Sequence, residues 1–322
     1  MVSIKDIAKQ AGVAISTVSY ALNNSPKVTE KTRSKILAIA EELNYVPNAA
    51  ARTLKKRHTK IIGAYFTDYG GSFFGELLRG MRRLLNEKGY DLIACTGKES
   101  HRFLPEGIID GAVILDNHFP DEKIIAYADR GHRIVVLDRE IDHPNIECVL
   151  LDNKMGAELA INFLINQGHK NLILLTGSEE SFDSNKRLEA AKKILKQHPS
   201  INYSTIQGHF DKESGEEAAK KIVIDYSSPV AIFSFNDEMA IGIYNYLKET
   251  PYHIGEHIHV IGFDDIELTN YIEPLLSTIH YSKEEWGKEA AEQLLNLIKN
   301  KTTKSKKIKM ELTKGDSVNK LT

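Results

Sequence analysis

The sequence predicts an α/β protein with a small helical unit at its N-terminus and a larger core of two parallel-sheet lobes. Three observations lead to this fold class. Residues 4–23 hold two short segments of apolar periodicity separated by Gly12, and residues 28–45 hold a third. From Ile61 onward, strand-like runs alternate with helix-like runs, which is typical of parallel sheets covered by helices. The alternation begins again after residues 148–153, so the core divides into two similar halves.

The N-terminal segment has the spacing of a helix-turn-helix unit, although an ordinary helical hairpin would share that spacing. Gly12 lies where the chain must turn sharply, and glycine does so without steric cost. Thr29 is the expected N-cap of the third helix. The residues expected to close the small core recur at helical spacing. They are Ile4, Ile7, Ala8, Val13, Val18, Leu22, Ile36, Leu37, Ile39, Ala40 and Leu43.

Polar side chains remain on the outer face of the second helix. Their hydroxyl and amide groups are of the kind that bonds phosphates and base edges in a major groove. These residues are Ser16, Thr17, Ser19, Tyr20 and Asn23. Through Lys60 the chain holds eleven Lys and Arg against four Asp and Glu, a formal charge of +7, whereas the whole chain is −2 and the remainder is therefore −9. This asymmetry indicates that only the N-terminal unit meets a polyanion.

The core is expected to follow one alternating order. In the first half, the expected elements are a strand near 61–69, a helix at 73–89, strands at 90–96 and 110–116, a helix near 121–131 and a strand at 133–140. In the second half, they are helices at 155–169, 184–197, 215–226 and 238–249, with strands at 171–177, 201–210, 230–237 and 257–265. A last strand is expected at 306–312. Small ligands of such sheets bind beyond the carboxyl ends of the strands.

Composition narrows the class of protein further. A content of 42% hydrophobic and 27% charged residues is ordinary for a globular chain. Cys95 and Cys148 lie in apolar runs, which favours buried thiols over a disulfide or metal pair. There is no charged-then-apolar leader and no apolar run near the ~20 residues that span a bilayer. We therefore expect a cytoplasmic protein, nucleoid-associated when it is bound to DNA, with no membrane partner.

Enzyme motifs are missing from the sequence. It contains no G-x-S-x-G or G-x-x-x-x-G-K pattern, and Gly70 and Gly71 lack the further glycines of a dinucleotide loop. His257 and His259 alternate at the start of a strand, and an exposed strand entrance explains them without a metal. We expect no catalytic residues, no metal and no cofactor.

The chain resembles the lactose/galactose repressor family from Ser3 to about Ser317. The resemblance rests on residues 4–23, on ELNYVPNAAARTL at 42–54, and on FNDEMAIG at 235–242 and VIGFDD at 260–265. It implies a homodimeric repressor of carbohydrate genes that binds a pseudo-palindromic operator in double-stranded DNA. It further implies a DNA-binding head (1–46), a hinge helix and linker (47–60), and a core like periplasmic binding proteins (61–322) whose small-molecule effector alters operator affinity.

The resemblance also assigns DNA-binding residues. It places Ile15, Ser16 and Tyr20 on the base-reading face, with Thr17, Ser19 and Asn23 near phosphates. Many relatives have arginine at the position of Tyr20, so either the half-site differs or Tyr20 contacts a phosphate. In the hinge it implies DNA contacts from Asn48 and Ala51, with Leu54 as the minor-groove wedge. Without the resemblance, the hinge would be interpreted as a solvated linker.

For the effector, the resemblance implies a polyhydroxyl ligand between the lobes. Its polar contacts are expected at Asp138, Arg187, Asn236 and Asp264, and its aromatic platforms at Tyr69, Phe73, Phe74 and Phe210. Each has an alternative role: Asp264 as a helix cap, Arg187 in a surface pair, the phenylalanines in the core. The family favours induction over corepression.

Two features concern assembly. Only about thirteen residues, 97–109, join the second and third strands of the first lobe, where relatives usually have a full helix near the subunit contact. We expect the interface to differ there. The tail after Asn300 has no leucine heptad and no signal for a tetramer.

The alternatives to a sugar-controlled repressor are a sugar receptor without DNA regulation, a corepressor-type regulator with a non-sugar effector, and an α/β enzyme with a DNA-targeting head.

Overall fold

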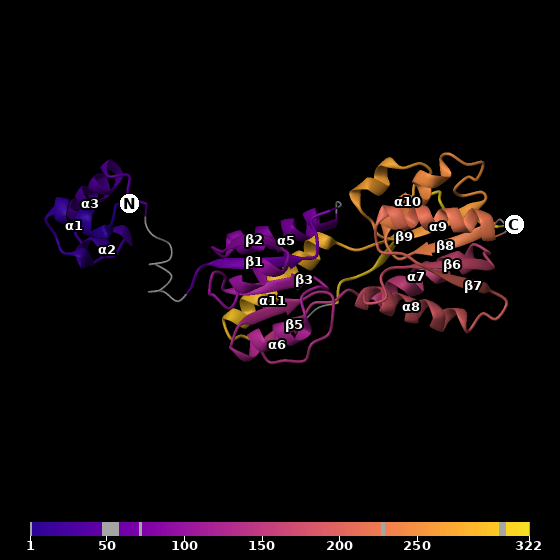
Figure 1. Cartoon of the computed structure of the whole chain (residues 1–322), viewed down its shortest axis with the longest axis horizontal. Helices are drawn as coiled ribbons and strands as arrows, with labels where there is room; N and C mark the ends of the chain where they lie inside the picture. The colour runs from indigo at the N-terminus through magenta and orange to yellow at the C-terminus, as the bar shows by residue number, and fades with distance from the viewer. Residues whose placement is uncertain (1, 47–57, 71–72, 227–228, 303–306, 322) are drawn as a thin grey trace. The chain divides into compact units, whose positions relative to one another are not determined.

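The computed structural model describes residues 2–46, 58–70, 73–226, 229–302 and 307–321. The chain divides into two compact units, Met1–Thr59 and Lys60–Thr322, and Figure 1 labels their elements. The expected hinge residues Asn48, Ala51 and Leu54 lie outside the described ranges. Within those ranges no helix is long and apolar enough to cross a membrane.

The N-terminal unit is a three-helix bundle. Its helices are α1 (Ile4–Ala11), α2 (Ile15–Leu22) and α3 (Glu30–Glu42). Gly12 ends α1 with a φ of 69°, and Thr29 caps α3 by accepting a hydrogen bond from the backbone of Thr32, both as predicted. The predicted inward position of Leu37 is wrong, because the buried face of α3 consists of Ile36 and Ala40 one turn apart and leaves Leu37 46% exposed.

The first lobe of the core is a five-stranded parallel sheet in the order β2-β1-β3-β4-β5. Its strands are β1 (Ile61–Phe66), β2 (Asp91–Thr96), β3 (Gly111–Leu115), β4 (Arg133–Val136) and β5 (Ile146–Cys148). Its helices are α5 (Phe73–Glu87), α6 (Asp121–Asp129) and α11 (Lys283–Ile298). The short connection at 97–109 holds a 3₁₀ segment, η1 (Lys98–Phe103), which the sequence did not predict.

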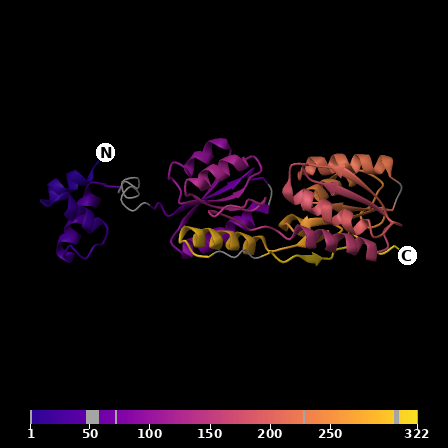
Figure 2. The same cartoon turned by 90° about the horizontal axis from the view of Figure 1, so that it is seen from below.

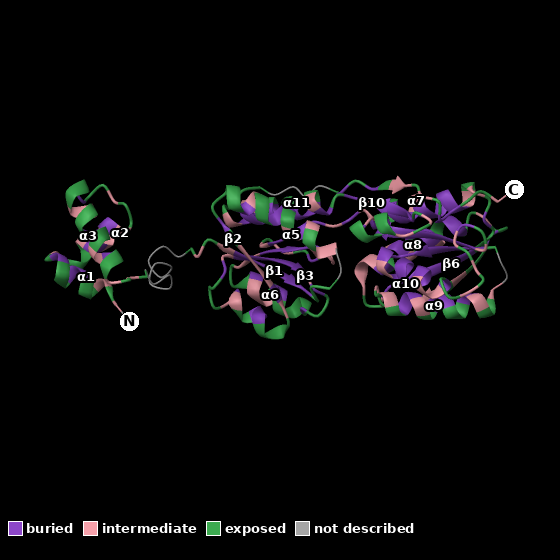
Figure 3. Ribbon diagram, turned by 90° about the horizontal axis from the view of Figure 1, so that it is seen from above, coloured by how far each residue is buried: buried purple, intermediate pink, exposed green. Residues whose placement is uncertain are grey.

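The second lobe is a six-stranded sheet in the order β11-β10-β9-β8-β6-β7, parallel except where β11 meets β10. Its strands are β6 (Asn171–Thr176), β7 (Asn202–Gln207), β8 (Val230–Ser234), β9 (Ile258–Asp264), β10 (Ser277–His280) and β11 (Glu311–Thr313). Its helices are α7 (Asn153–Asn166), α8 (Phe182–Leu195), α9 (Lys212–Asp225) and α10 (Asp237–Leu247), with η2 (Glu267–Tyr271) between β9 and β10. Figure 3 shows helices with exposed outer faces around this sheet, whose central strands β6, β8 and β9 are buried while the edge strand β7 is not.

The chain returns from the second lobe to the first late in the sequence. It leaves the first lobe after β5, comes back after β10 to form α11, and crosses again to reach β11. In Figures 1 and 2, α11 lies against the first sheet beside α5. The two helices meet backbone to backbone, since a Cβ on Gly80 would lie 1.9 Å from the Glu284 carbonyl oxygen and one on Gly287 would lie 2.1 Å from that of Leu77.

Three further expectations are corrected. The strand predicted at 306–312 is reduced to β11, with Ile308 in an isolated bridge to Leu151. Cys95 is a buried free thiol as predicted, whereas Cys148 is free but only half-buried, near the end of the edge strand β5. His259 is buried rather than exposed, because the C-terminal tail covers β9 and the Asn319 backbone donates to its ring.

Candidate functional site: recognition helix and core cavity

The outer face of α2 presents the side chains expected to read DNA. Val18 and Ala21 are buried against the other two helices, which leaves the opposite face free. Ile15 is 47% exposed, and an exposed β-branched side chain at a helix start suits contact with a thymine methyl group. Ser16 and Asn23 are exposed, while Thr17, Ser19 and Tyr20 are half-buried.

Two of these side chains are already engaged inside the head. The Asn23 amide donates one of its two hydrogens to the Ser19 carbonyl oxygen at 2.7 Å, which leaves its second N–H and its oxygen for DNA. The Tyr20 ring packs against the small core, and the Lys27 ammonium lies 5.2 Å from its centre. A lysine beside the ring places a phosphate-binding cation next to Tyr20. Both interpretations of Tyr20, base contact and phosphate contact, stay open.

The core contains a cavity of about 590 Å³ lined by residues of both lobes. Seven of the eight side chains expected to contact an effector line it, and they come from strand ends and helix starts. They are Phe73, Phe74, Asp138, Arg187, Phe210, Asn236 and Asp264. Tyr69 is not among the lining residues, and its side chain is 49% exposed beyond β1, so its predicted role as a platform is not supported by its position.

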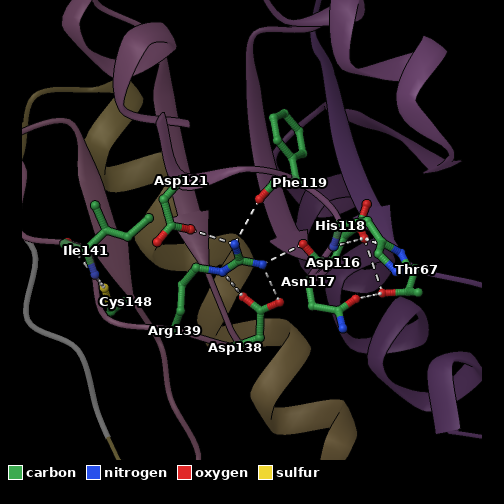
Figure 4. Close-up of polar contacts among 10 residues, drawn as sticks. All are labelled: Thr67, Asp116, Asn117, His118, Phe119, Asp121, Asp138, Arg139, Ile141 and Cys148. Carbon is green, nitrogen blue, oxygen red and sulfur yellow. Dashed lines mark hydrogen bonds and ion pairs between the residues drawn. The ribbon is translucent and has the colours of Figure 1, made fainter. Parts of the chain in front are cut away.

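On the first-lobe wall, Asp138 forms a two-pronged ion pair with Arg139 (Figure 4). Arg139 Nε and Nη2 donate to the two carboxylate oxygens at 2.8 and 2.9 Å, and Nη1 donates to Asp121 at 2.7 Å. Arg139 also donates to the carbonyl oxygens of Asp116 and Phe119. Burial raises the pKa of Asp138, and the adjacent guanidinium opposes that rise. A ligand at this wall therefore meets a carboxylate fixed in orientation by its neighbour.

On the second-lobe wall, Arg187 projects from α8 and is only 3% exposed. Its Nε donates to Asn153 Oδ1 at 2.8 Å and its Nη1 to the carbonyl oxygen of Phe235. Asn153 in turn donates to Asp183 at 2.6 Å. Burial raises the pKa of Asp183, and the positive charge of Arg187 opposes the rise. The alternative of a surface ion pair for Arg187 is thus wrong.

Asp264 occupies the carboxyl end of β9 in an unusual backbone conformation. Its φ is 110° and that of Asp265 is 52°, a region that non-glycine residues adopt at an energetic cost. The Tyr281 hydroxyl donates to Asp264 Oδ1 at 2.8 Å. Burial raises the pKa of Asp264 to about 6, although Arg187 and Lys283 lower it. Asp264 does not cap the next segment; it is a buried carboxyl that titrates close to neutrality.

Asn236 and Phe210 form one structural unit at the second-lobe wall. Asn236 caps α10 by accepting from the Met239 backbone at 3.0 Å, and its amide donates to the Phe210 carbonyl oxygen at 2.8 Å. Phe210 has a φ of 67°, and its ring lies directly over Gly177, where a Cβ would come within 2.1 Å of the ring. The amide of Asn236 therefore holds the loop that carries Phe210.

Aromatic rings form the apolar part of the lining. Phe73 and Phe74 begin α5 and meet at 5.2 Å between ring centres, and both pack against the buried core as well as lining the cavity. Trp286 from α11 lies 6.3 Å from Phe73, and its indole nitrogen donates to the Val149 carbonyl oxygen at 2.7 Å. Such faces suit the apolar side of a sugar ring.

Several lining residues are absent from the sequence-based prediction. They are Arg139, Asp183, Phe182, Tyr281 and Trp286. Arg139 directly follows Asp138, so the strand-end rule that found Asp138 could have included it. Tyr281 and Trp286 surround the crossing from β10 to α11, a segment for which no element was predicted. Among the described residues there is no group of three or more His, Cys, Asp or Glu that could hold a metal ion.

Comparison with known proteins agrees with this architecture. Residues 3–48 match the profile described as bacterial regulatory proteins, lacI family, and residues 161–318 match that of a periplasmic binding protein-like domain. The chain is 35% identical over 333 residues to the probable HTH-type transcriptional repressor ExuR of Bacillus subtilis (strain 168), with 100% of both chains covered.

Two solved structures show the same fold. A sugar-binding transcriptional regulator (LacI family) from Enterococcus faecalis is 47% identical with a TM-score of 0.78, covering 82% of this chain and 99% of the other. The lac repressor dimer bound to operator and the anti-inducer ONPF is 25% identical with a TM-score of 0.85, covering 99% of both chains.

Proposed function

Because the chain belongs to the lacI family of bacterial regulatory proteins, we propose that the small molecule controlling this DNA-binding repressor is a sugar bound in the core cavity. The family consists of transcription regulators rather than enzymes. The observation that carries the proposal is a cavity of about 590 Å³ with fixed hydrogen-bonding groups on both walls, Asp138 on one and Arg187 with Asp264 on the other. The Enterococcus faecalis regulator, described as sugar-binding, supports it.

A sugar satisfies this lining in a way that an apolar ligand would not. Each hydroxyl both donates and accepts, so it can donate to a carboxylate while accepting from a guanidinium. Phe73 and Phe210 provide the apolar faces. A ligand that bonds to Asp138 and Asp264 together bridges the lobes, and such bridging favours closure of the cavity. We propose that closure alters the spacing of the hinge segments at 47–60 and thereby releases DNA, so the sugar is an inducer.

On the DNA side, we propose a homodimer on a pseudo-palindromic operator, as the lac repressor dimer on its operator suggests. The base-reading face carries Ile15, Ser16 and Tyr20, with Tyr20 contacting either a base or a phosphate, and the phosphate contacts are Thr17, Ser19 and Asn23. In the hinge, Asn48 and Ala51 contact DNA and Leu54 is the wedge. The organisation into a head (1–46), hinge (47–60) and core (61–322) belongs to the same proposal, as does a cytoplasmic, nucleoid-associated location.

The test combines a ligand screen with operator binding. Thermal-shift screening of pentoses, hexoses and disaccharides with the full chain should give stabilisation by at least one sugar. A gel shift on an operator selected from random DNA should then weaken when that sugar is added. Arg187→Ala should lose the sugar response while still binding the operator. Stabilisation only by a non-sugar metabolite, or a sugar with no effect on DNA binding, would contradict the proposal.

A further inference from the structure

A lysine at the start of α11 is buried and forms no salt bridge with any of the residues that the structure describes. Lys283 is 1% exposed, and its ammonium donates to two backbone carbonyl oxygens, that of Asp264 and that of Asp265, the latter at 3.2 Å. In the described part of the chain no carboxylate oxygen lies within 4.0 Å of this ammonium. Burying a charge with no ion partner is unfavourable. Here the two hydrogen bonds to carbonyl oxygens offset part of that cost.

The two carbonyls belong to the most unusual stretch of backbone at the cavity. Asp264 and Asp265 both have positive φ, and consecutive residues of this kind persist only where the surroundings hold them. Lys283 binds both residues at once. It is therefore a brace on the conformation that places the Asp264 carboxyl in the cavity lining.

The brace comes from the opposite lobe. Asp264 ends β9 of the second sheet, whereas Lys283 opens α11, which packs on α5 of the first lobe. The next residue, Glu284, meets Gly80 of α5 through its backbone, so the first turn of α11 has little freedom to shift. Phe73 and Phe74 of α5 line the same cavity. Lys283 thus joins a ligand-facing carboxyl of one lobe to the helix pair of the other.

The charges around Asp264 show what else the ammonium contributes. Asp183 and Arg187 face it from α8, Asp237 from α10, and Tyr281 from the segment after β10, with Asp265 next in the chain. Carboxyls outnumber cations in this group. Arg187 and Lys283 are the two positive charges that lower the pKa of Asp264 against the effect of burial.

We infer that Lys283 is a positioning residue of the ligand site, holding the Asp264–Asp265 backbone on α11 and supplying the positive charge that keeps the Asp264 carboxylate available to a ligand. The ligand-binding part of this inference rests on the proposed function. The brace and the charge effect do not, because both are properties of the free protein.

The primary experiment needs no ligand. The carboxyl carbons of aspartate are ¹³C-labelled in the full-length protein, the Asp264 signal is assigned by its absence in Asp264→Asn, and its chemical shift is followed with pH. Lys283→Met should raise the pKa of Asp264 by about 1, since an opposite charge nearby typically lowers a carboxyl pKa by 1–3. Lys283→Arg, which keeps the charge, should leave it close to the wild-type value. An unchanged pKa in Lys283→Met would overturn the inference.

Folding of the variants is checked first, and a second neutral variant is available in case Lys283→Met disturbs the local structure. Circular dichroism and thermal unfolding should show that Lys283→Met folds, because replacing a buried charge by an apolar side chain is often tolerated. If it does not fold, Lys283→Gln takes its place in the titration. If Asp264 keeps its wild-type pKa in every neutral variant that folds, the proposed effect of the Lys283 charge is wrong.

The second experiment uses the sugar found in the screen. At pH 7, Lys283→Met should bind it at least ~10-fold more weakly than wild type, and raising the pH to 8.5 should recover part of the loss as Asp264 ionises. Lys283→Arg should bind with intermediate affinity. Weakened binding that does not recover at high pH would refute the charge role. A pKa shift in a protein that binds no sugar would instead refute the proposed function and leave the brace intact.

Discussion

The guanidinium carbon of Arg187 lies 3.5 Å from the centre of the Phe263 ring, while its Nε donates to Asn153 at 2.8 Å. Stacking on one side and hydrogen bonds at the edge fix the plane of the guanidinium, and its charge lowers the pKa of both Asp183 and Asp264 against the effect of burial. Lysine cannot reproduce a stacked, forked geometry. The orientation of the second-lobe wall therefore depends on arginine itself and not on positive charge alone.

From this relationship we predict that Arg187→Lys weakens binding of the effector sugar by ~10- to 100-fold, the range expected for loss of one or two charge-assisted hydrogen bonds. Titration calorimetry on the wild type and the variant measures the change. Lys186→Met, in the neighbouring position on the same helix but outside the cavity lining, is the matched control and should bind normally. Equal affinities for Arg187→Lys and wild type would show that the guanidinium geometry does not matter.

The second prediction concerns pH. The pKa of Asp264 is raised from 3.8 to about 6 in the folded protein. Because the pKa is higher in the folded protein than in the unfolded chain, protonation of Asp264 favours the folded state. This contribution to stability is complete below the pKa of the unfolded chain and is lost as the pH rises through about 6. Ligand affinity should run the other way, because a carboxylate accepts sugar hydroxyl hydrogens better than a neutral acid does, so affinity should fall as the pH drops below about 6.

Two measurements check these opposite trends. Calorimetric titrations from pH 5 to 8 follow the affinity, and urea unfolding over the same range follows the stability. Asp138, Asp183 and Asp237 also have raised pKa values and add to the stability trend. The contribution of Asp264 is therefore the difference between the pH-dependent change in stability of wild type and that of Asp264→Asn, expected to be on the order of 1.5 kcal/mol between pH 5 and 8, about half of the full effect of such a shift. An affinity that is flat between pH 5 and 8 would contradict the role of Asp264 as an acceptor.

Much of this site follows from the sequence because strand ends share one edge of a sheet. Asp138, Asn236 and Asp264 come at or just after the ends of β4, β8 and β9, and the carboxyl ends of parallel strands gather their side chains there. Alternation of strands and helices is enough to find such positions. That reasoning cannot extend to Tyr69, which follows β1 in the same way but projects outward from a loop.

The remainder depends on contacts between distant parts of the chain. The return of α11 to the first lobe is set by the fit of Gly80 against Glu284 and of Gly287 against Leu77, pairs separated by about two hundred residues. Local periodicity shows that a segment is helical but not which sheet it covers. Tyr281 and Trp286 reach the cavity, and Lys283 reaches the backbone of Asp264, only because of that crossing, so no spacing rule identifies them.

A third prediction concerns the charge of the ligand. Six carboxylates line the cavity, those of Asp121, Asp138, Glu180, Asp183, Glu238 and Asp264. They face two arginines, and Arg139 is already bound to Asp138 and Asp121. An added negative charge would meet repulsion here. We expect a neutral sugar to bind at least ~10-fold more tightly than its matching uronic acid at pH 7.5.

Pairs such as glucose with glucuronate and galactose with galacturonate provide the comparison, measured by calorimetry at fixed ionic strength. The difference within a pair should shrink at pH 5.5, where protonation of Asp264 removes one negative charge. Tighter binding of the uronic acid at pH 7.5 would contradict this prediction. It would show that attraction by Arg187 outweighs repulsion by the carboxylates.

The last prediction separates the two interpretations of Tyr20. If its hydroxyl contacts a base edge, Tyr20→Phe should lower affinity for the selected operator by 1–3 kcal/mol and relax the preference at one position of each half-site. If it contacts a phosphate, the same variant should weaken all DNA sequences alike. Lys27→Met serves as the reference for a phosphate effect, because the Lys27 ammonium lies beside the Tyr20 ring and follows α2 in the chain, outside the helix that carries the base-reading residues. Selection of operators from random DNA by each variant, together with the salt dependence of binding, distinguishes the two. An unchanged operator preference and affinity in Tyr20→Phe would exclude both roles for the hydroxyl and leave Tyr20 as a packing residue of the head.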